Sequence, residues 1–102
     1  MSEAEIVRLR EEIADVDRET VALVAKRLHL AEQLGLEKKR LGRPLRDEGV
    51  EEAVHTRLLT ECATQGISRS FAEGLARLLI DESVRRQRAV RSPARSQGGS
   101  SP

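Results

Sequence analysis

One heptad pattern runs from Ile6 to Leu34 and restricts this chain to a helical fold. Residues seven positions apart form two series, which together make the inward stripe of one long amphipathic helix. The series are Ile6, Ile13, Thr20, Arg27 and Leu34, and Leu9, Val16, Leu23 and Leu30. Arg27 stands where a leucine is expected. Because a guanidinium keeps its proton, burying it without an anion would cost several kcal/mol.

Lys38 brings a second cation to the same face of this helix. It follows Arg27 by eleven residues, which is about 20° around a helix and about 16 Å along it. Two interpretations follow from this. Either Arg27 pairs with a glutamate of a neighbouring helix, or the two cations form a buried site for an anionic ligand.

The size and composition predict a small helical domain that requires a partner. The chain has 102 residues, of which 38% are hydrophobic and 34% charged, and Phe71 is the only aromatic residue. A chain of this length buries a low fraction of its surface. One long helix with two shorter ones would leave much of the apolar stripe exposed in a monomer. We therefore expect an obligate homodimer.

The charge distribution argues against a nucleic-acid-binding protein. The formal net charge is +1, with 18 basic and 17 acidic residues intermixed, and stacking aromatic residues are lacking. The basic residues near the end of the last helix are predicted to be a solvated helix face, not a phosphate-binding patch. They are Arg85, Arg86, Arg88, Arg91 and Arg95.

Other classes of protein are disfavoured as well. Cys62 is the only cysteine, so the chain offers no intrachain disulfide and no metal-ligand spacing, and we expect a cytoplasmic protein. The sequence has no run of eighteen apolar residues and no charged leader followed by an apolar stretch, so it predicts neither a membrane span nor a secretory signal. His29 and His55 are isolated from any nucleophile, and we interpret both as surface or boundary residues.

Periodicity and capping signals predict an all-α fold with one long and two shorter helices, from residue 2 or 3 to about 41, from 48 to about 64, and from 69 to about 89 or 91. The capping and helix-ending residues are Ser2, Gly42, Pro44, Asp47, Gly66 and Ser68. Residues 1–91 make the predicted domain. Residues 92–102 are low in complexity and nearly free of apolar residues, so we expect a disordered tail.

The third helix is predicted to change from apolar to polar along its inward face. Leu75 and Leu79 are followed at the same four-residue spacing by Ser83 and Gln87. A polar wall inside a helical protein predicts a ligand or a polar partner. The other residues predicted to face inward on the second and third helices are Glu51, Val54, Leu58, Cys62, Phe71, Leu78 and Glu82.

The inward polar residues suit the binding of an anion that carries further polar groups. They are Arg27, Lys38, Glu51, Ser83 and Gln87. None of them forms a nucleophile–base pair, a metal cluster or a phosphate loop. Arg10 precedes Arg27 by about 25 Å along a straight helix. In an antiparallel dimer, Arg10 of one chain would reach the site of the other.

The chain resembles the small all-helical (AroQ-type) chorismate mutases over about residues 5–90. The motifs that carry the resemblance are LREEIADVD, VALVAKR, the lysine of LEKK, RPLRDEGVEE and IDESVRRQ, in that order. Their combined spacing is far more specific than any one motif. The resemblance implies an intertwined homodimer with shared active sites. It also implies a Claisen rearrangement of chorismate to prephenate in aromatic amino acid biosynthesis, without a cofactor or metal.

The resemblance implies catalytic roles for Lys38, Gln87 and Arg27. Arg27 and the partner chain's Arg10 would bind the two carboxylates of the substrate. Lys38 and Gln87 would donate hydrogen bonds to the ether oxygen, where negative charge develops as the bond to carbon breaks.

Further substrate contacts are implied for Glu51, Asp47 and Ser83. Glu51 and the backbone near Asp47 would accept hydrogen bonds from the C4 hydroxyl, and Ser83 would contact a carboxylate. The chain departs from the family at Val50, where an arginine is common. Three functions are therefore open for this chain: an ordinary but slower mutase, a mutase for 4-amino-4-deoxychorismate, or an isochorismate-pyruvate lyase.

Two alternatives from other classes stay open. One is a noncatalytic helical dimer that binds a metabolite, and the other is a structural coiled coil in which Glu51 satisfies Arg27. The sequence shows no obvious segment for phenylalanine or tyrosine feedback, which argues against built-in allosteric control and leaves control by an activating partner enzyme open.

Overall fold

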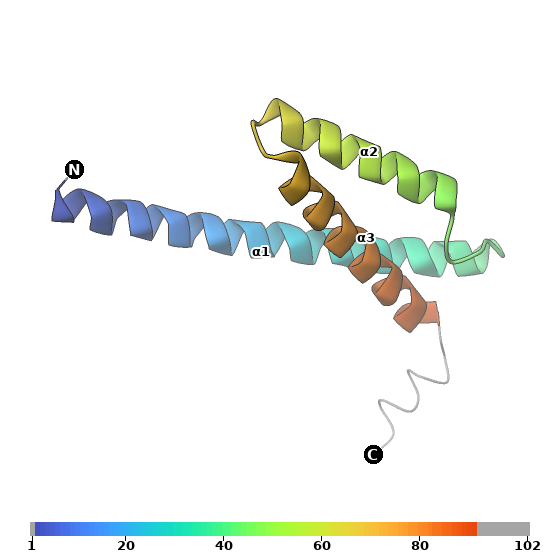
Figure 1. Ribbon diagram of the computed structural model, residues 1–102. Coiled ribbons are helices and arrows are strands. Elements are labelled where there is room, and N and C mark those ends of the chain that lie inside the picture. The colour runs from blue at the N-terminus through green and yellow to red at the C-terminus, as the bar shows by residue number, and fades with distance from the viewer. Residues whose placement is uncertain (1, 92–102) are drawn as a thin grey trace, which may run out of the picture.

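The computed structural model describes residues 2–91, and this range contains three helices and no strand. The helices are α1 (Glu3–Arg40), α2 (Glu48–Thr64) and α3 (Arg69–Arg91) (Figure 1). The all-α fold class is thus confirmed, and each helix begins and ends within two residues of its predicted bounds. The predicted tail and Arg95 lie outside the described residues.

Each helix begins at a side-chain cap. The side-chain oxygens of Ser2, Asp47 and Ser68 accept hydrogen bonds of 3.2, 3.1 and 3.3 Å from the backbone N–H three residues later. These bonds satisfy donors that have no partner within the helix. Gly42 and Gly66 have φ of 70° and 74°, the left-handed geometry that lets the chain turn away after a helix.

The helix α3 holds the fold together. It packs against both α1 and α2, whereas α1 and α2 do not pack directly on each other in the part of the chain described. In Figure 1, α3 crosses the C-terminal half of α1, and the N-terminal half of α1 extends away from both other helices. The 38 residues of α1 make a rod of about 57 Å, so α1 alone accounts for the longest dimension of 58 Å.

The contact between the helices is built mainly on small side chains. The buried apolar residues are Leu28, Ala31, Cys62, Ala72, Ala76 and Val84. At Gly35, an added Cβ would lie 2.9 Å from the Cα of Gln87. The missing side chain at Gly35 therefore sets how closely α3 approaches α1.

The predicted inward stripe is only partly buried within one chain. Ile13 and Leu23 of this stripe are 60% and 65% exposed. The residues of α1 that are buried, Leu28, Ala31 and Gly35, lie outside the two predicted series, at the place where α3 crosses α1. The radius of gyration is 18.1 Å, against about 13 Å for a compact domain of this length. A single chain therefore leaves much of its apolar stripe without a packing partner.

Two positions on α3 differ from the prediction in the same way. Phe71 and Leu78 were expected to face inward, but they are 61% and 70% exposed in the single chain. The buried face of α3 instead passes through Ala72 and Ala76, because the small side chains allow the close helix contact.

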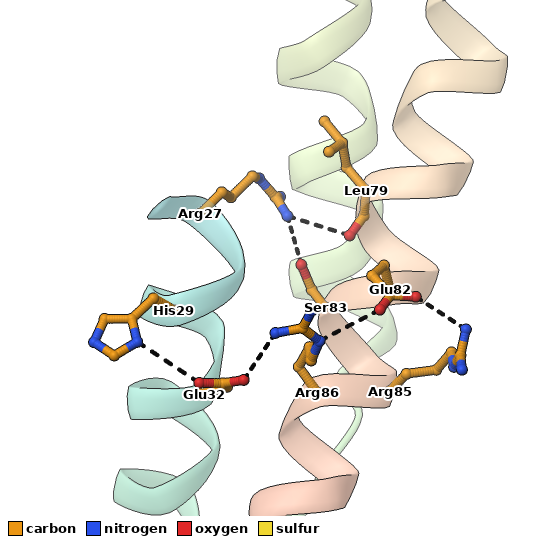
Figure 2. A network of polar contacts seen from close by, with 8 residues as sticks. All are labelled: Arg27, His29, Glu32, Leu79, Glu82, Ser83, Arg85 and Arg86. Carbon is orange, nitrogen blue, oxygen red and sulfur yellow. Dashed lines mark hydrogen bonds and ion pairs between the residues drawn. The ribbon is translucent and has the colours of Figure 1, made fainter. Parts of the chain in front are cut away.

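Ion pairs join α1 and α3 outside the buried contact. Arg86 contacts Glu32 of α1 at 2.9 Å and Glu82 of its own helix at 3.4 Å, and His29 lies 3.7 Å from Glu32 (Figure 2). Arg85 also pairs with Glu82, at 3.1 Å. The basic end of α3 is therefore partly neutralised by carboxylates. No helix within residues 2–91 is long and apolar enough to cross a membrane.

Replacing Gly35 with alanine should destabilise the fold, because the new Cβ would overlap the backbone at Gln87. We expect the free energy of unfolding to fall by about 1–2 kcal/mol, since overpacking outweighs the gain in helix propensity. Gly74 of α3 is the matched control, because nothing lies within 4 Å of a Cβ built there. Gly74→Ala should stabilise the helix. Urea unfolding at equal protein concentrations measures both, and shifts in the same direction would contradict the prediction.

Candidate active site

A cavity of about 590 Å³ opens between the C-terminal part of α1, the loop 41–47, the start of α2 and the second half of α3. Six of the seven residues predicted for the site line it. They are Arg27, Lys38, Asp47, Glu51, Ser83 and Gln87. The remaining wall is largely apolar, and its apolar residues are Leu30, Ala31, Leu34, Leu41, Pro44, Leu45, Val50, Val54, Ile80 and Val84.

Arg27 reaches from α1 to α3 through neutral groups. Its Nη1 donates hydrogen bonds to the carbonyl oxygen of Leu79 at 3.2 Å and to the Ser83 hydroxyl at 2.5 Å (Figure 2). No carboxylate within residues 2–91 forms an ion pair with it. The alternative in which Glu51 satisfies Arg27 is therefore wrong, because Glu51 pairs with Arg46 instead.

The charge of Arg27 is held in an unfavourable environment. Burial lowers the pKa of Arg27, and the positive charge of Arg57 on α2 lowers it further. An arginine remains protonated even so. A half-buried cation with a like-charged neighbour and only neutral hydrogen-bond acceptors is poised to bind an anion.

Lys38 and Gln87 form the second polar pair of the cavity. The Nζ of Lys38 donates to the carbonyl oxygen of Leu45 at 3.0 Å and to Oε1 of Gln87 at 2.8 Å. An ammonium group has three donors, so one donor remains for a ligand. The amide nitrogen of Gln87 makes no hydrogen bond to a described residue and is also left for a ligand. Gln87 and Ser83 are both buried.

Glu51 lines the cavity at the start of α2, where its carboxylate is held by the preceding loop. Arg46 donates from Nη2 and Nε to the two carboxylate oxygens of Glu51, at 2.6 and 2.9 Å. These hydrogen bonds hold the pKa of Glu51 below its usual value, although burial acts in the opposite direction. Glu51 is thus an ionised acceptor beside the cavity.

The cavity wall next to Glu51 carries no positive charge at position 50. Val50 lines the cavity and its backbone N–H donates to the Asp47 side chain at 3.1 Å. The Asp47 carboxylate is therefore engaged in capping α2, and its backbone carbonyl accepts from the N–H of Glu51 at 2.9 Å.

The structure does not bring Arg10 to this cavity. Arg10 is exposed on the N-terminal half of α1, about 25 Å along the helix from Arg27. A role for Arg10 therefore depends on a second chain.

Several residues that contribute to the site were not predicted. Arg43 and Glu37 line the cavity, and Arg46 orients Glu51. The ion pair of Glu37 with Arg40 could have been predicted, because the two residues are three positions apart on one helix. The contact of Arg46 with Glu51 could not, because Arg46 lies in a loop where helical spacing does not apply. Within residues 2–91, no three histidine, cysteine, aspartate or glutamate side chains come together in a way that would hold a metal ion.

Comparisons with known proteins identify the family of this chain. The sequence model described as chorismate mutase type II matches residues 9–88, a range that contains every residue of the cavity. The chain is 34% identical over 89 residues to proteins named bifunctional chorismate mutase/prephenate dehydratase from Escherichia coli and Shigella flexneri. The matched region is 87% of this chain but 23% of each relative. This chain belongs to the chorismate mutase type II family.

Proposed function

We propose that this protein is an isomerase that rearranges chorismate to prephenate, a step of aromatic amino acid biosynthesis, in the cytoplasm. One observation carries the proposal. Arg27 and Lys38 line the same cavity, neither is paired with a carboxylate of the described residues, and both contact buried polar side chains of α3. This arrangement suits a small dicarboxylate with a polar centre, and the name of the bifunctional relatives agrees with it.

Arg27 would bind one carboxylate of chorismate. Two hydrogen bonds to α3 fix the guanidinium, and its remaining donors suit a carboxylate. Ser83, which accepts one of these bonds, would lie next to the same carboxylate. Binding both carboxylates would fold the enolpyruvyl side chain over the ring and hold the two reacting carbons close together.

Lys38 and Gln87 would stabilise the transition state. The rearrangement breaks the ether carbon–oxygen bond while a carbon–carbon bond forms, so negative charge develops on the ether oxygen. The free donor of Lys38 and the free amide nitrogen of Gln87 converge from α1 and α3, which supports a role as a preorganised pair of donors. Glu51 would accept a hydrogen bond from the C4 hydroxyl, and the backbone at Asp47 would lie beside the same hydroxyl.

The functional unit would be an intertwined homodimer. The exposed apolar stripe of α1 and the extended shape of the single chain support this assembly. Pairing of two long α1 helices would cover that stripe. It would also place Arg10 of each chain at the site of its partner, so that two arginines bind the two carboxylates of the substrate.

Val50 favours a second candidate function. An apolar residue stands beside the Glu51 carboxylate in the wall that would face the C4 substituent. A substrate with an ammonium group at C4, 4-amino-4-deoxychorismate, would meet no arginine at position 50. The protein would then be a mutase of an aminophenylalanine pathway.

A turnover assay with both substrates tests these functions. We expect prephenate from chorismate, detected by chromatography. Lys38→Ala should lower kcat by 10²–10³-fold, because losing one preorganised donor typically costs about 2.7–4 kcal/mol of barrier. Higher kcat/KM with the amino compound would establish the second candidate. A folded protein that turns over neither substrate would contradict both and leave a lyase or a binding module.

Replacing Arg27 with methionine should separate binding from stability. We expect the affinity for chorismate to fall by about 1.5–3 kcal/mol, the usual worth of a hydrogen bond to a charged group. The midpoint of thermal unfolding should stay close to that of the wild type, because no ion pair is lost with the guanidinium. Calorimetry measures both quantities. A large loss of stability with unchanged affinity would show that Arg27 is a structural residue.

Mixing two inactive variants tests the shared site. Arg10→Ala and Lys38→Ala should each be inactive alone. If Arg10 acts on the partner's site, each mixed dimer has one intact site, and random subunit exchange should restore about a quarter of the wild-type activity. No recovery after verified exchange would show that Arg10 acts within its own chain, and an Arg10→Ala variant that is active alone would show that Arg10 has no role.

A further inference from the structure

Arg46 contacts the site without lining the cavity. It precedes the N-cap Asp47, and its guanidinium makes two hydrogen bonds to the carboxylate of Glu51, of 2.6 and 2.9 Å. The carboxylate is 23% exposed and the arginine 51%. Such two-point contacts between a planar guanidinium and a carboxylate fix the carboxylate plane as well as its position.

The positions of these two residues explain why they meet. Relative to the N-cap of α2, which is Asp47, Arg46 is the preceding residue (N′) and Glu51 is the fourth residue of the helix (N4). In many helices these two positions hold an apolar pair that sets the angle at which the chain enters the helix. Here an ion pair takes that place. The same contact therefore sets the path of the loop and the orientation of the Glu51 carboxylate.

Two other charged groups also act on Glu51. Lys38 of α1 lowers the pKa of Glu51 and Asp47 raises it, but the hydrogen bonds from Arg46 have the largest effect and lower it. Asp81 of α3 acts on Arg46 and raises its pKa. The remaining charged residues around this part of the cavity are Glu37, Arg43 and Glu48.

We infer that Arg46 is a positioning residue that decides which substituent Glu51 accepts at the C4 end of the substrate. This inference rests on the proposed function. Paired with Arg46, the carboxylate is neutralised but keeps free lone pairs toward the cavity, so it accepts a hydrogen bond from a hydroxyl. An ammonium group in the same place would meet a carboxylate whose charge is already balanced. Arg46 thus favours the hydroxyl over the ammonium substrate, although Val50 removes a cation from the wall.

Two variants separate the charge of Arg46 from its geometry. Arg46→Gln removes the charge and the paired hydrogen bonds, whereas Arg46→Lys keeps the charge but cannot make the planar two-point contact. Arg69→Gln is the matched control, because Arg69 also forms an exposed ion pair with a glutamate, Glu73, at 3.7 Å and lies outside the cavity.

The first measurement is steady-state turnover of chorismate and 4-amino-4-deoxychorismate. Arg46→Gln should lower kcat/KM for chorismate by roughly fivefold, the effect typical of one exposed ion pair. The loss should lie mainly in KM, because the C4 substituent does not react. The ratio of kcat/KM for the amino compound to that for chorismate should rise by at least the same factor. Arg46→Lys should keep the substrate preference of the wild type, and Arg69→Gln should change nothing.

The second measurement is the pH dependence. Because Arg46 lowers the pKa of Glu51, the ionised carboxylate of the wild type persists to lower pH. In Arg46→Gln this pKa should rise, so kcat/KM should begin to fall at a higher pH as the solution is acidified. NMR titration of the Glu51 side-chain carboxyl, assigned with Glu51→Gln, should show the same shift without any substrate.

These measurements distinguish the failure of the inference from the failure of the proposed function. A wild-type protein that turns over neither substrate contradicts the proposed function. In that case the NMR titration still tests whether Arg46 lowers the pKa of Glu51. An unchanged titration in Arg46→Gln would overturn the inference. So would an unchanged substrate preference in an active enzyme, which would reduce Arg46 to a residue that only shapes the loop.

Discussion

The contact of Arg27 with the Ser83 hydroxyl and the Leu79 carbonyl is the interaction on which the site depends. It links α1 to α3 while leaving the positive charge without a counter-ion in the described part of the chain. A carboxylate in place of Ser83 would stabilise the empty protein and fill the anion site at the same time. Neutral acceptors instead orient the guanidinium and keep its charge available for a ligand.

The crossing of α1 and α3 at Gly35 determines how the other polar groups are arranged. Gln87 lies directly against Gly35, and Lys38, about one turn further along α1, reaches the Gln87 amide from there. Ser83 lies one turn earlier on α3 and meets Arg27, two turns before Gly35 on α1. This single close helix contact therefore determines the positions of the Arg27 and Lys38 donor groups, and neither group can shift without a change in the helix packing.

The sequence predicted the three helices and six polar residues that line the cavity, because capping residues, heptad spacing and the change from Leu79 to Ser83 are local signals. It did not predict which residues of the long helix are buried within one chain. The heptad series identify one apolar face, but α3 crosses α1 beside that face and buries Leu28 and Ala31, which belong to neither series. The role of Arg46 was also missed, because its contact with Glu51 depends on the loop path and not on helical periodicity.

The cavity occupies the space where α1 and α2 would otherwise pack on each other. In the described range these helices are joined only through α3 and the connecting loop, while both contribute walls to the cavity. A bound ring would therefore fill the place of missing core side chains and bridge two helices that do not pack closely on each other. Because α1 and α2 each pack on α3, the way in which these two helices pack on α3 sets the distance between them and so limits how bulky a molecule the protein can enclose.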